Sequence, residues 1–100
     1  MIRYIKLDKS DNIKKKFVAT FYDEDKNKVK TTHFGSAGMS DYTINKDDSR
    51  KELYLNRHKK NENWNDFTSA GSLSRWILWN QKTLELSLKY YMNKFNLKKN

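Results

Sequence analysis

The chain has 100 residues, of which 21 are Lys or Arg and 12 are Asp or Glu, so its net charge is +9. It contains no cysteine, which excludes disulfide scaffolds, thiolate metal sites and thiol proteases. No apolar stretch is long enough to span a membrane, and no signal peptide is visible. Aromatic residues make up 14% of the chain, so we expect one folded domain over residues 1–100, with a core over residues 2–95 and a frayed tail at residues 96–100.

The first half of the chain has the pattern of β-strands. Three runs are rich in β-branched and aromatic side chains and are separated by polar segments: residues 2–7, 16–22 and 28–34. Alternation along the second run places Phe17, Ala19 and Phe21 on one face. We therefore expect a hairpin or a three-stranded meander whose Phe17 face packs on the core.

The second half has the spacing of helices, which we predict over three segments: residues 49–60, 72–80 and 83–95. Ser49 and Glu52 have the spacing of a capping box, and Thr83 can cap the last helix. The apolar residues 76–79 are expected to cover the Phe17 face of the sheet, although a partner surface is the alternative. The predicted fold is α+β, with a small N-terminal antiparallel sheet of two to three strands packed against two to three C-terminal helices.

Two of the three glycines, Gly35 and Gly38, lie in the loop after the last predicted strand. Their Gly-x-x-Gly spacing permits backbone with positive φ, and successive N–H groups in such a loop can bind an anion. Lys46 and Arg50 follow closely and would place cations beside a bound phosphate. The alternative is a tight turn that needs glycine for its geometry alone, and the sequence is consistent with both interpretations.

Positive charge is concentrated in three places: Lys14–Lys16, Lys26–Lys30 and Arg57–Lys60. Residues 51–100 hold ten Lys and Arg against four Asp and Glu, whereas residues 1–50 hold eleven against eight. Lysine outnumbers arginine, which favours phosphate contact over the reading of bases. We predict a protein that binds nucleic acid, DNA in preference to RNA, without sequence specificity. The predicted contact residues are Lys28, Lys30, Gly35, Gly38, Tyr42, Lys46, Arg50, Arg57, His58, Lys59, Lys60 and Trp64.

Four sequence motifs follow one another along the chain: TTHFGSAGMSDYT, YLNRHKKNENW, TSAG and ILWN. Over most of residues 15–95 the chain resembles a family of small basic proteins of unknown function that large double-stranded DNA viruses of algae and protists encode. The resemblance implies a viral protein in which strands are followed by helices, and it supplies no catalytic residues. Together with the basic charge, a viral origin leads us to expect localisation in the virion or in the cytoplasm or nucleus of an infected host cell, and a role in genome packaging or in handling viral DNA or RNA.

Two other functions compete with nucleic-acid binding. A structural virion or capsid-associated module would use residues 76–79 to contact other virion proteins or a second copy in a homodimer. A metal-dependent nuclease of the HNH type would use His33, Asn45 and His58, whose order loosely resembles that layout, but no clear set of further metal ligands accompanies His58. We therefore predict no catalytic residue, no metal site, no cofactor and no membrane partner.

Overall fold

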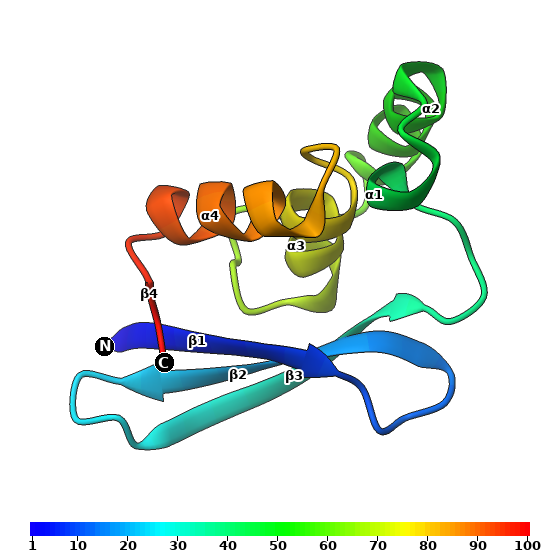
Figure 1. Cartoon of the computed structure of the whole chain (residues 1–100). Coiled ribbons are helices and arrows are strands. Elements are labelled where there is room, and N and C mark those ends of the chain that lie inside the picture. The colour runs from blue at the N-terminus through cyan, green and yellow to red at the C-terminus, as the bar shows by residue number, and fades with distance from the viewer.

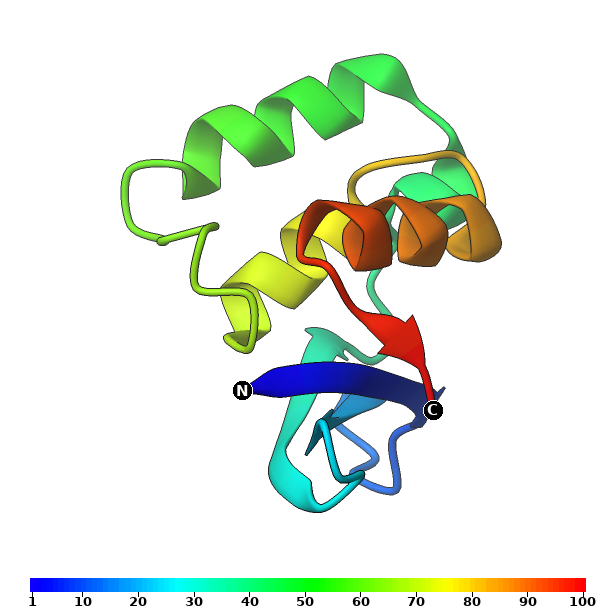
Figure 2. The same cartoon turned by 90° about the vertical axis from the view of Figure 1, so that its left-hand side faces the viewer.

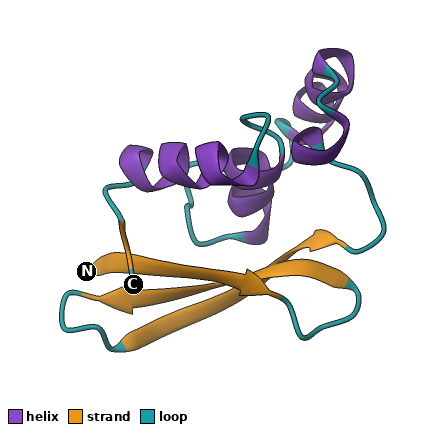
Figure 3. Cartoon of the chain, in the orientation of Figure 1, coloured by secondary structure: helices purple, strands orange, loops and turns teal.

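A four-stranded sheet forms one layer of the molecule, and helices cover one of its faces (Figure 1; Figure 3). The computed structural model describes all of residues 1–100. The strands are β1 (Ile2–Lys9), β2 (Lys15–Asp23), β3 (Lys28–Ser36) and β4 (Lys98–Lys99), in the spatial order β3-β2-β1-β4. The first three strands form an antiparallel meander, whereas β4 pairs with β1 in parallel.

The sheet differs from the one that the sequence predicts. The prediction of an antiparallel sheet of two or three N-terminal strands was wrong, because the sheet is mixed and its fourth strand comes from the end of the chain. Tyr4 and Ile5 of β1 pair with Lys98 and Lys99. Leu97, inside the tail that we expected to fray, is only 6% exposed. Burial of this side chain holds the last residues against β1, and the fold is α+β with strands at both ends of the chain.

The core lies between the helices and one face of the sheet. Phe21 of β2 is opposite Ile5 of β1, and Phe34 of β3 is opposite Phe17 of β2, so apolar side chains from three strands meet on this face. Ala19, Phe21 and Phe34 are 0% exposed, which confirms the predicted alternation along β2. Each large apolar side chain buried here stabilises the fold by roughly 1.5–3 kcal/mol.

Five helical segments complete the chain: α1 (Tyr42–Asn45), α2 (Asp48–His58), α3 (Ala70–Leu73), the π-helical turn η1 (Ser74–Leu78) and α4 (Leu84–Lys94). This is more than the two or three helices expected, because the predicted helix over residues 72–80 is divided into α3 and η1, and α1 was not anticipated. None of these segments combines the length and the apolar character that a membrane-crossing helix needs.

The helix caps agree with the sequence for α4 and differ for α2. The Thr83 hydroxyl accepts a hydrogen bond from the Leu86 N–H at 3.2 Å, as predicted. The cap of α2 is Asp47 and not Ser49, since the Asp47 carboxylate accepts from the N–H groups of Ser49 at 2.9 Å and Arg50 at 3.3 Å. A carboxylate at this position also interacts favourably with the helix dipole, so the cap lies two residues earlier than expected.

The apolar run at residues 76–79 lies in the core. Ile77 and Leu78 are 0% and 2% exposed, and Trp76 and Trp79 pack against the same cluster. A π-helical turn carries the run, with the Trp79 N–H donating to the Ser74 carbonyl at 3.1 Å. A π-helical turn is wider than an α-helical turn, and here its consecutive large side chains pack against the core. The expectation that this run covers the sheet is therefore confirmed.

The molecule has two parts with different burial. The body consists of the sheet with α3, η1 and α4, and the arm consists of residues 41–60, which include α1 and α2. In both views α2 lies farthest from the sheet (Figure 1; Figure 2), and none of its residues is buried. The position of the arm beside the ends of β2 and β3 creates the site described next.

Candidate functional site

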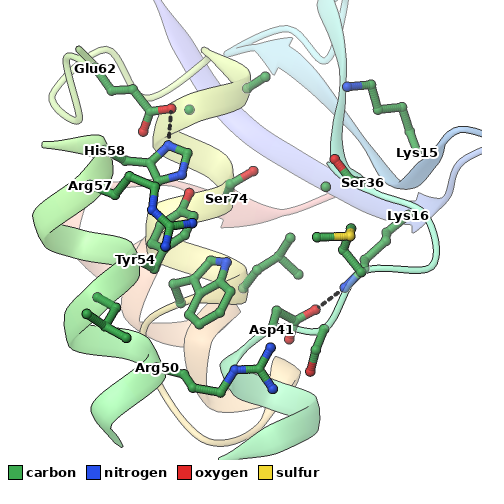
Figure 4. A pocket seen from close by; sticks show the side chains of 18 residues that line it. Lys15, Lys16, Ser36, Asp41, Arg50, Tyr54, Arg57, His58, Glu62 and Ser74 are labelled. Carbon is green, nitrogen blue, oxygen red and sulfur yellow. Dashed lines mark hydrogen bonds and ion pairs between the residues drawn. The ribbon is translucent and has the colours of Figure 1, made fainter. Parts of the chain in front are cut away.

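A cleft with a volume of about 410 Å³ lies between α2 and the adjoining ends of β2 and β3 (Figure 4). One wall is a face of α2, and the opposite wall consists of the start of β2, the end of β3 and the loop that leads to α1. Residues of α3 and η1 connect the two walls. The cleft is therefore formed jointly by the arm and the body.

The α2 wall is a single stripe of side chains. Arg50, Leu53, Tyr54, Arg57 and His58 all line the cleft. Their spacing of three and four residues places them on one face of the helix. The chemistry of the stripe changes along the helix. It begins with the cation Arg50, continues with the apolar pair Leu53 and Tyr54, and ends with Arg57 and His58. Such a surface suits a ligand that has both anionic and apolar parts.

The cleft contains more positive than negative charge. Lys15 and Lys16 line the β2 side, and Arg50 and Arg57 line the α2 side; the Lys16 side chain is directed toward Asp41 (Figure 4). The Lys16 ammonium contacts the carboxylate of Asp41, a buried residue, at 2.5 Å. Lys15, Arg50 and Arg57 make no ion pair. Three cationic side chains therefore remain available to an anionic ligand.

Aromatic rings stack in a column behind the α2 wall. The Tyr54 ring lies between His58, at a centroid distance of 4.2 Å, and Trp79, at 4.4 Å. The His58 Nδ1 is 3.2 Å from the Glu62 carboxylate, which also accepts a hydrogen bond from the Trp64 indole at 2.9 Å. Burial, followed by the charge of Glu62, raises the pKa of the Tyr54 phenol well above its usual value. The Tyr54 phenol is therefore neutral at physiological pH, and its stack on Trp79 links α2 to the body.

The two loop glycines both require positive φ, at 78° for Gly35 and 82° for Gly38. A Cβ on Gly35 would lie 2.8 Å from the Leu78 side chain, whereas a Cβ on Gly38 would meet no atom within 4 Å. The N–H groups of Ala37 and Met39 donate to the carbonyls of Lys14 and Ser36. These two donors are therefore engaged within the chain, and turn geometry accounts for both glycines.

The cleft unites only some of the residues that the sequence singled out. Gly35, Arg50, Arg57 and His58 line it, whereas the other predicted contacts lie outside: Lys28, Lys30, Gly38, Tyr42, Lys46, Lys59, Lys60 and Trp64. Lys15 and Lys16 line the cleft and were absent from the predicted contacts, although they belong to the basic run Lys14–Lys16. A run of lysines in a strand does not reveal which helix it will face, so only the fold identifies these two.

Several predicted contact residues have structural partners instead. The Tyr42 side chain is buried, and its hydroxyl donates to the Asp48 carboxylate. Trp64 is half-buried, with the Arg75 guanidinium 5.2 Å from the centre of its ring. Lys30 donates to the Thr68 hydroxyl at 3.0 Å. In this structure the Tyr42 and Trp64 rings are not free surfaces for stacking of bases.

The two histidines lie on different elements and have different partners. His33 of β3 shares a hydrogen bond of 2.7 Å between its Nδ1 and the Ser10 hydroxyl, and His58 of α2 faces Glu62. No group of three or more His, Asp or Glu side chains is arranged to hold a metal ion. The nuclease alternative gains no supporting observation and stays a prediction.

The chain belongs to a family of unknown function, DUF5754, whose model matches residues 5–58. The matched segment extends from β1 through α2, so it includes both principal walls of the cleft. No curated protein and no solved structure matches the chain.

Proposed function

We propose that this protein binds nucleic acid without sequence preference, through contacts between the phosphates and the cations of the cleft. The observation that carries the proposal is that Lys15, Arg50 and Arg57 line the same cleft and that none of them makes an ion pair. Lysine and arginine side chains that contact phosphates release counterions, and this supplies affinity independent of sequence. The net charge of +9 adds long-range attraction for a polyanion.

DNA is the proposed partner, and the biological setting rests on the motif resemblance. The motifs from TTHFGSAGMSDYT to ILWN support an origin in a large double-stranded DNA virus. In that setting the protein would act in genome packaging or in handling viral DNA, within the virion or the infected cell. Four further lysines lie outside the cleft, and we assign them a long-range attraction for DNA within the same proposal: Lys28, Lys30, Lys59 and Lys60.

The alternative function, a structural virion module, was suggested by the apolar run at residues 76–79. That interpretation relied on residues 76–79 as an exposed apolar patch. Ile77 and Leu78 are buried, and Trp76 and Trp79 are partly buried against the same core, so this run gives the virion module less support than the cleft gives nucleic-acid binding. Nucleic-acid binding is the function that an observed arrangement of side chains supports best.

A salt titration tests the proposal directly. A fluorescently labelled DNA oligonucleotide is titrated with the full chain at two salt concentrations, and anisotropy reports binding. With about three phosphates contacted, affinity should fall roughly 40-fold between about 50 and 200 mM salt. Absence of binding at the lower salt concentration would contradict the proposal, and binding indifferent to salt would contradict the phosphate contacts.

Two charge-matched double variants locate the site. Arg50→Gln with Arg57→Gln removes two positive charges from the cleft, and Lys28→Gln with Lys30→Gln removes two from β3 outside it. We expect the arginine pair to lower affinity about 10- to 100-fold. The slope of log affinity against log salt concentration should also become shallower, by the amount expected for the loss of about two phosphate contacts. The lysine pair should lower affinity only about two- to threefold, through the weaker long-range field. Equal losses would assign the affinity to total charge and not to the cleft.

A further inference from the structure

We propose that the cleft receives a single nucleotide of an unpaired strand, so that the protein prefers single-stranded to duplex DNA. This inference rests on the proposed function and assigns a substrate class to the same cleft. It follows from three properties of the cleft: its size, the order of chemical groups along α2, and the exposed apolar side chains at its mouth.

The size of the cleft fits one nucleotide. Its volume of about 410 Å³ lies within the range of sites that enclose small molecules. A DNA duplex is a wide rod that carries its phosphates on the outside and keeps its bases stacked within. Such a rod could touch the rim of the cleft but could not enter it. An unpaired strand can turn one base and its phosphate inward.

The order of groups along α2 matches the order of groups in a nucleotide chain. Arg50 and Arg57 are two helical turns apart, so their Cα atoms are separated by about 10 Å along the axis. Leu53 and Tyr54 lie between them on the same face. The two faces of the Tyr54 ring are covered by His58 and Trp79, so a base would contact Leu53 and the edge of Tyr54. Its flanking phosphates would then be directed toward the two guanidinium groups. The planar guanidinium forms paired hydrogen bonds with phosphate oxygens.

Apolar side chains at the mouth remain uncovered by the protein itself. Leu53 is 59% exposed and Met39, on the opposite wall, is 65% exposed. A site that bound phosphate alone would gain nothing from these two side chains. Apolar contact with the face of a base removes both from water, and because every base has such a face this contact does not depend on sequence. The charged and apolar groups of the cleft are thus both used only when base and phosphate bind together.

The walls of the cleft are held firmly enough to present this surface. On the α2 side, the Tyr54 ring stacks on Trp79 of the body, and His58 of the same helix stacks on Tyr54. On the opposite side, the buried Asp41 carboxylate holds the Lys16 ammonium at 2.5 Å and also accepts from the Thr43 N–H at 2.9 Å. A preformed site loses less entropy when a flexible single strand binds.

The first experiment compares three small probes by NMR on the isotope-labelled protein: adenosine monophosphate, adenosine and inorganic phosphate. We expect the monophosphate to bind about tenfold more tightly than either of the others, because it alone carries base and phosphate. Resonances of Arg50, Leu53, Arg57 and Ser36 should shift. Equal binding of inorganic phosphate would overturn the nucleotide site in favour of an anion site, and shifts confined to other elements would overturn the location.

The second experiment compares a thymine oligonucleotide of about 12 nucleotides with the duplex that it forms with its complement, by competition anisotropy. We expect the single strand to bind about tenfold more tightly at the same salt concentration. Equal affinity, still dependent on salt and on Arg50 with Arg57, would overturn this inference and leave the proposed function intact. Failure of both DNA forms to bind would overturn both.

A matched pair of exposed leucines separates base contact from charge. Leu53→Ser alters the mouth of the cleft, and Leu86→Ser alters a leucine of α4 that is 53% exposed and lies outside the cleft. We expect Leu53→Ser to weaken single-strand binding about fivefold more than it weakens duplex binding, and Leu86→Ser to change neither. Unfolding curves of both variants verify the fold. An effect of Leu53→Ser equal on both DNA forms, or none on either, would contradict contact with a base.

Discussion

The body and the arm of this protein are held in place by different interactions. The body buries Phe21, Ile77 and Tyr91 completely, in one apolar cluster between helices and sheet. In the arm, α2 buries no residue and is attached at a few points. The Lys51 ammonium donates to the Asn80 carbonyl at 2.6 Å, and the Tyr54 ring stacks on Trp79. The helix with most of the cleft's free cations therefore contributes little to the apolar core.

This difference teaches that stability and binding depend on largely separate residues. Changes in the body should alter the free energy of unfolding, and changes on the cleft face of α2 should alter affinity. The stacking of Tyr54 on Trp79 and the ion pair between Lys16 and Asp41 are the places where the two properties meet. The predictions below test where that boundary lies.

The largest loss of stability is expected from a cavity in the body. Phe21→Ala removes a ring that is 0% exposed and should lower the free energy of unfolding by about 3–5 kcal/mol. Leu53→Ala in the arm, at a side chain that is 59% exposed, should change it by no more than about 0.5 kcal/mol. Urea unfolding followed by tryptophan fluorescence measures both. A comparable loss in the two variants would show that the arm is part of the cooperative core.

A smaller loss is expected where the loop meets the body. Gly35→Ala places a side chain at a φ of +78°, with its Cβ 2.8 Å from the Leu78 side chain. We expect it to lower the free energy of unfolding by about 2–4 kcal/mol. Gly38→Ala has a φ of +82° but open space, and should cost only about 1–2 kcal/mol. Thermal unfolding of both variants gives the difference. If Gly38→Ala proved the more damaging, crowding against Leu78 would not be the reason for glycine at position 35.

Alkaline pH should weaken the body through Tyr91. Burial raises the pKa of the Tyr91 phenol far above its usual value, and its hydroxyl donates to the Phe67 carbonyl at 2.5 Å. In the unfolded chain the Tyr91 phenol ionises near pH 10, whereas in the folded chain it stays neutral, so its contribution to stability is full below pH 10. Above pH 10 this contribution should fall by up to about 1.4 kcal/mol per pH unit, and Tyr54, whose pKa is also raised by burial, acts in the same direction. Denaturant midpoints measured between about pH 9 and 11 report the slope. Tyr91→Phe should reduce that slope, and an unchanged slope would assign it to other groups.

The smallest effect is expected at the cap of α2. Asp47→Ala removes the carboxylate that accepts from the N–H groups of Ser49 and Arg50, and should cost about 1 kcal/mol. Amide hydrogen exchange should accelerate in the first turn of α2 and remain unchanged in β2. Asp47→Ser retains a cap and should restore most of the protection. Faster exchange throughout the body would show that the helix start is coupled to the core.

The parts of the fold that depend on local pattern could be predicted from the sequence. Alternation along β2 correctly placed Ala19 and Phe21 inside, and the hydroxyl of Thr83 correctly marked the start of α4. The fourth strand could not be predicted, since Lys98 and Lys99 have no β-pattern and pair with β1 only because Leu97 is buried next to them. The π-helical turn likewise depends on packing, because no residue type specifies it.

The candidate site was predictable on one wall only. Arg50, Arg57 and His58 lie at helical spacing, and the sequence named all three as contacts. Lys15 and Lys16 were visible as part of a basic run, but their place opposite α2 depends on how the loop after Gly35 returns toward the body. Tyr42 was misjudged as a surface ring because its burial follows from tertiary packing and not from local sequence.

The pairing of β4 with β1 has a consequence for how the chain folds. Its two partners lie at opposite ends of the sequence, and contacts of such separation close late because they require the largest loss of chain entropy. The local meander of β1, β2 and β3 can form first, which leaves the outer edge of β1 with unpaired backbone groups. We therefore expect a transient three-stranded species in which the edge of β1 is unpaired and can pair with another chain. This species disappears when β4 pairs with β1. Removing Leu97 and the residues after it should accordingly increase aggregation during refolding more than it changes the affinity of the cleft for DNA.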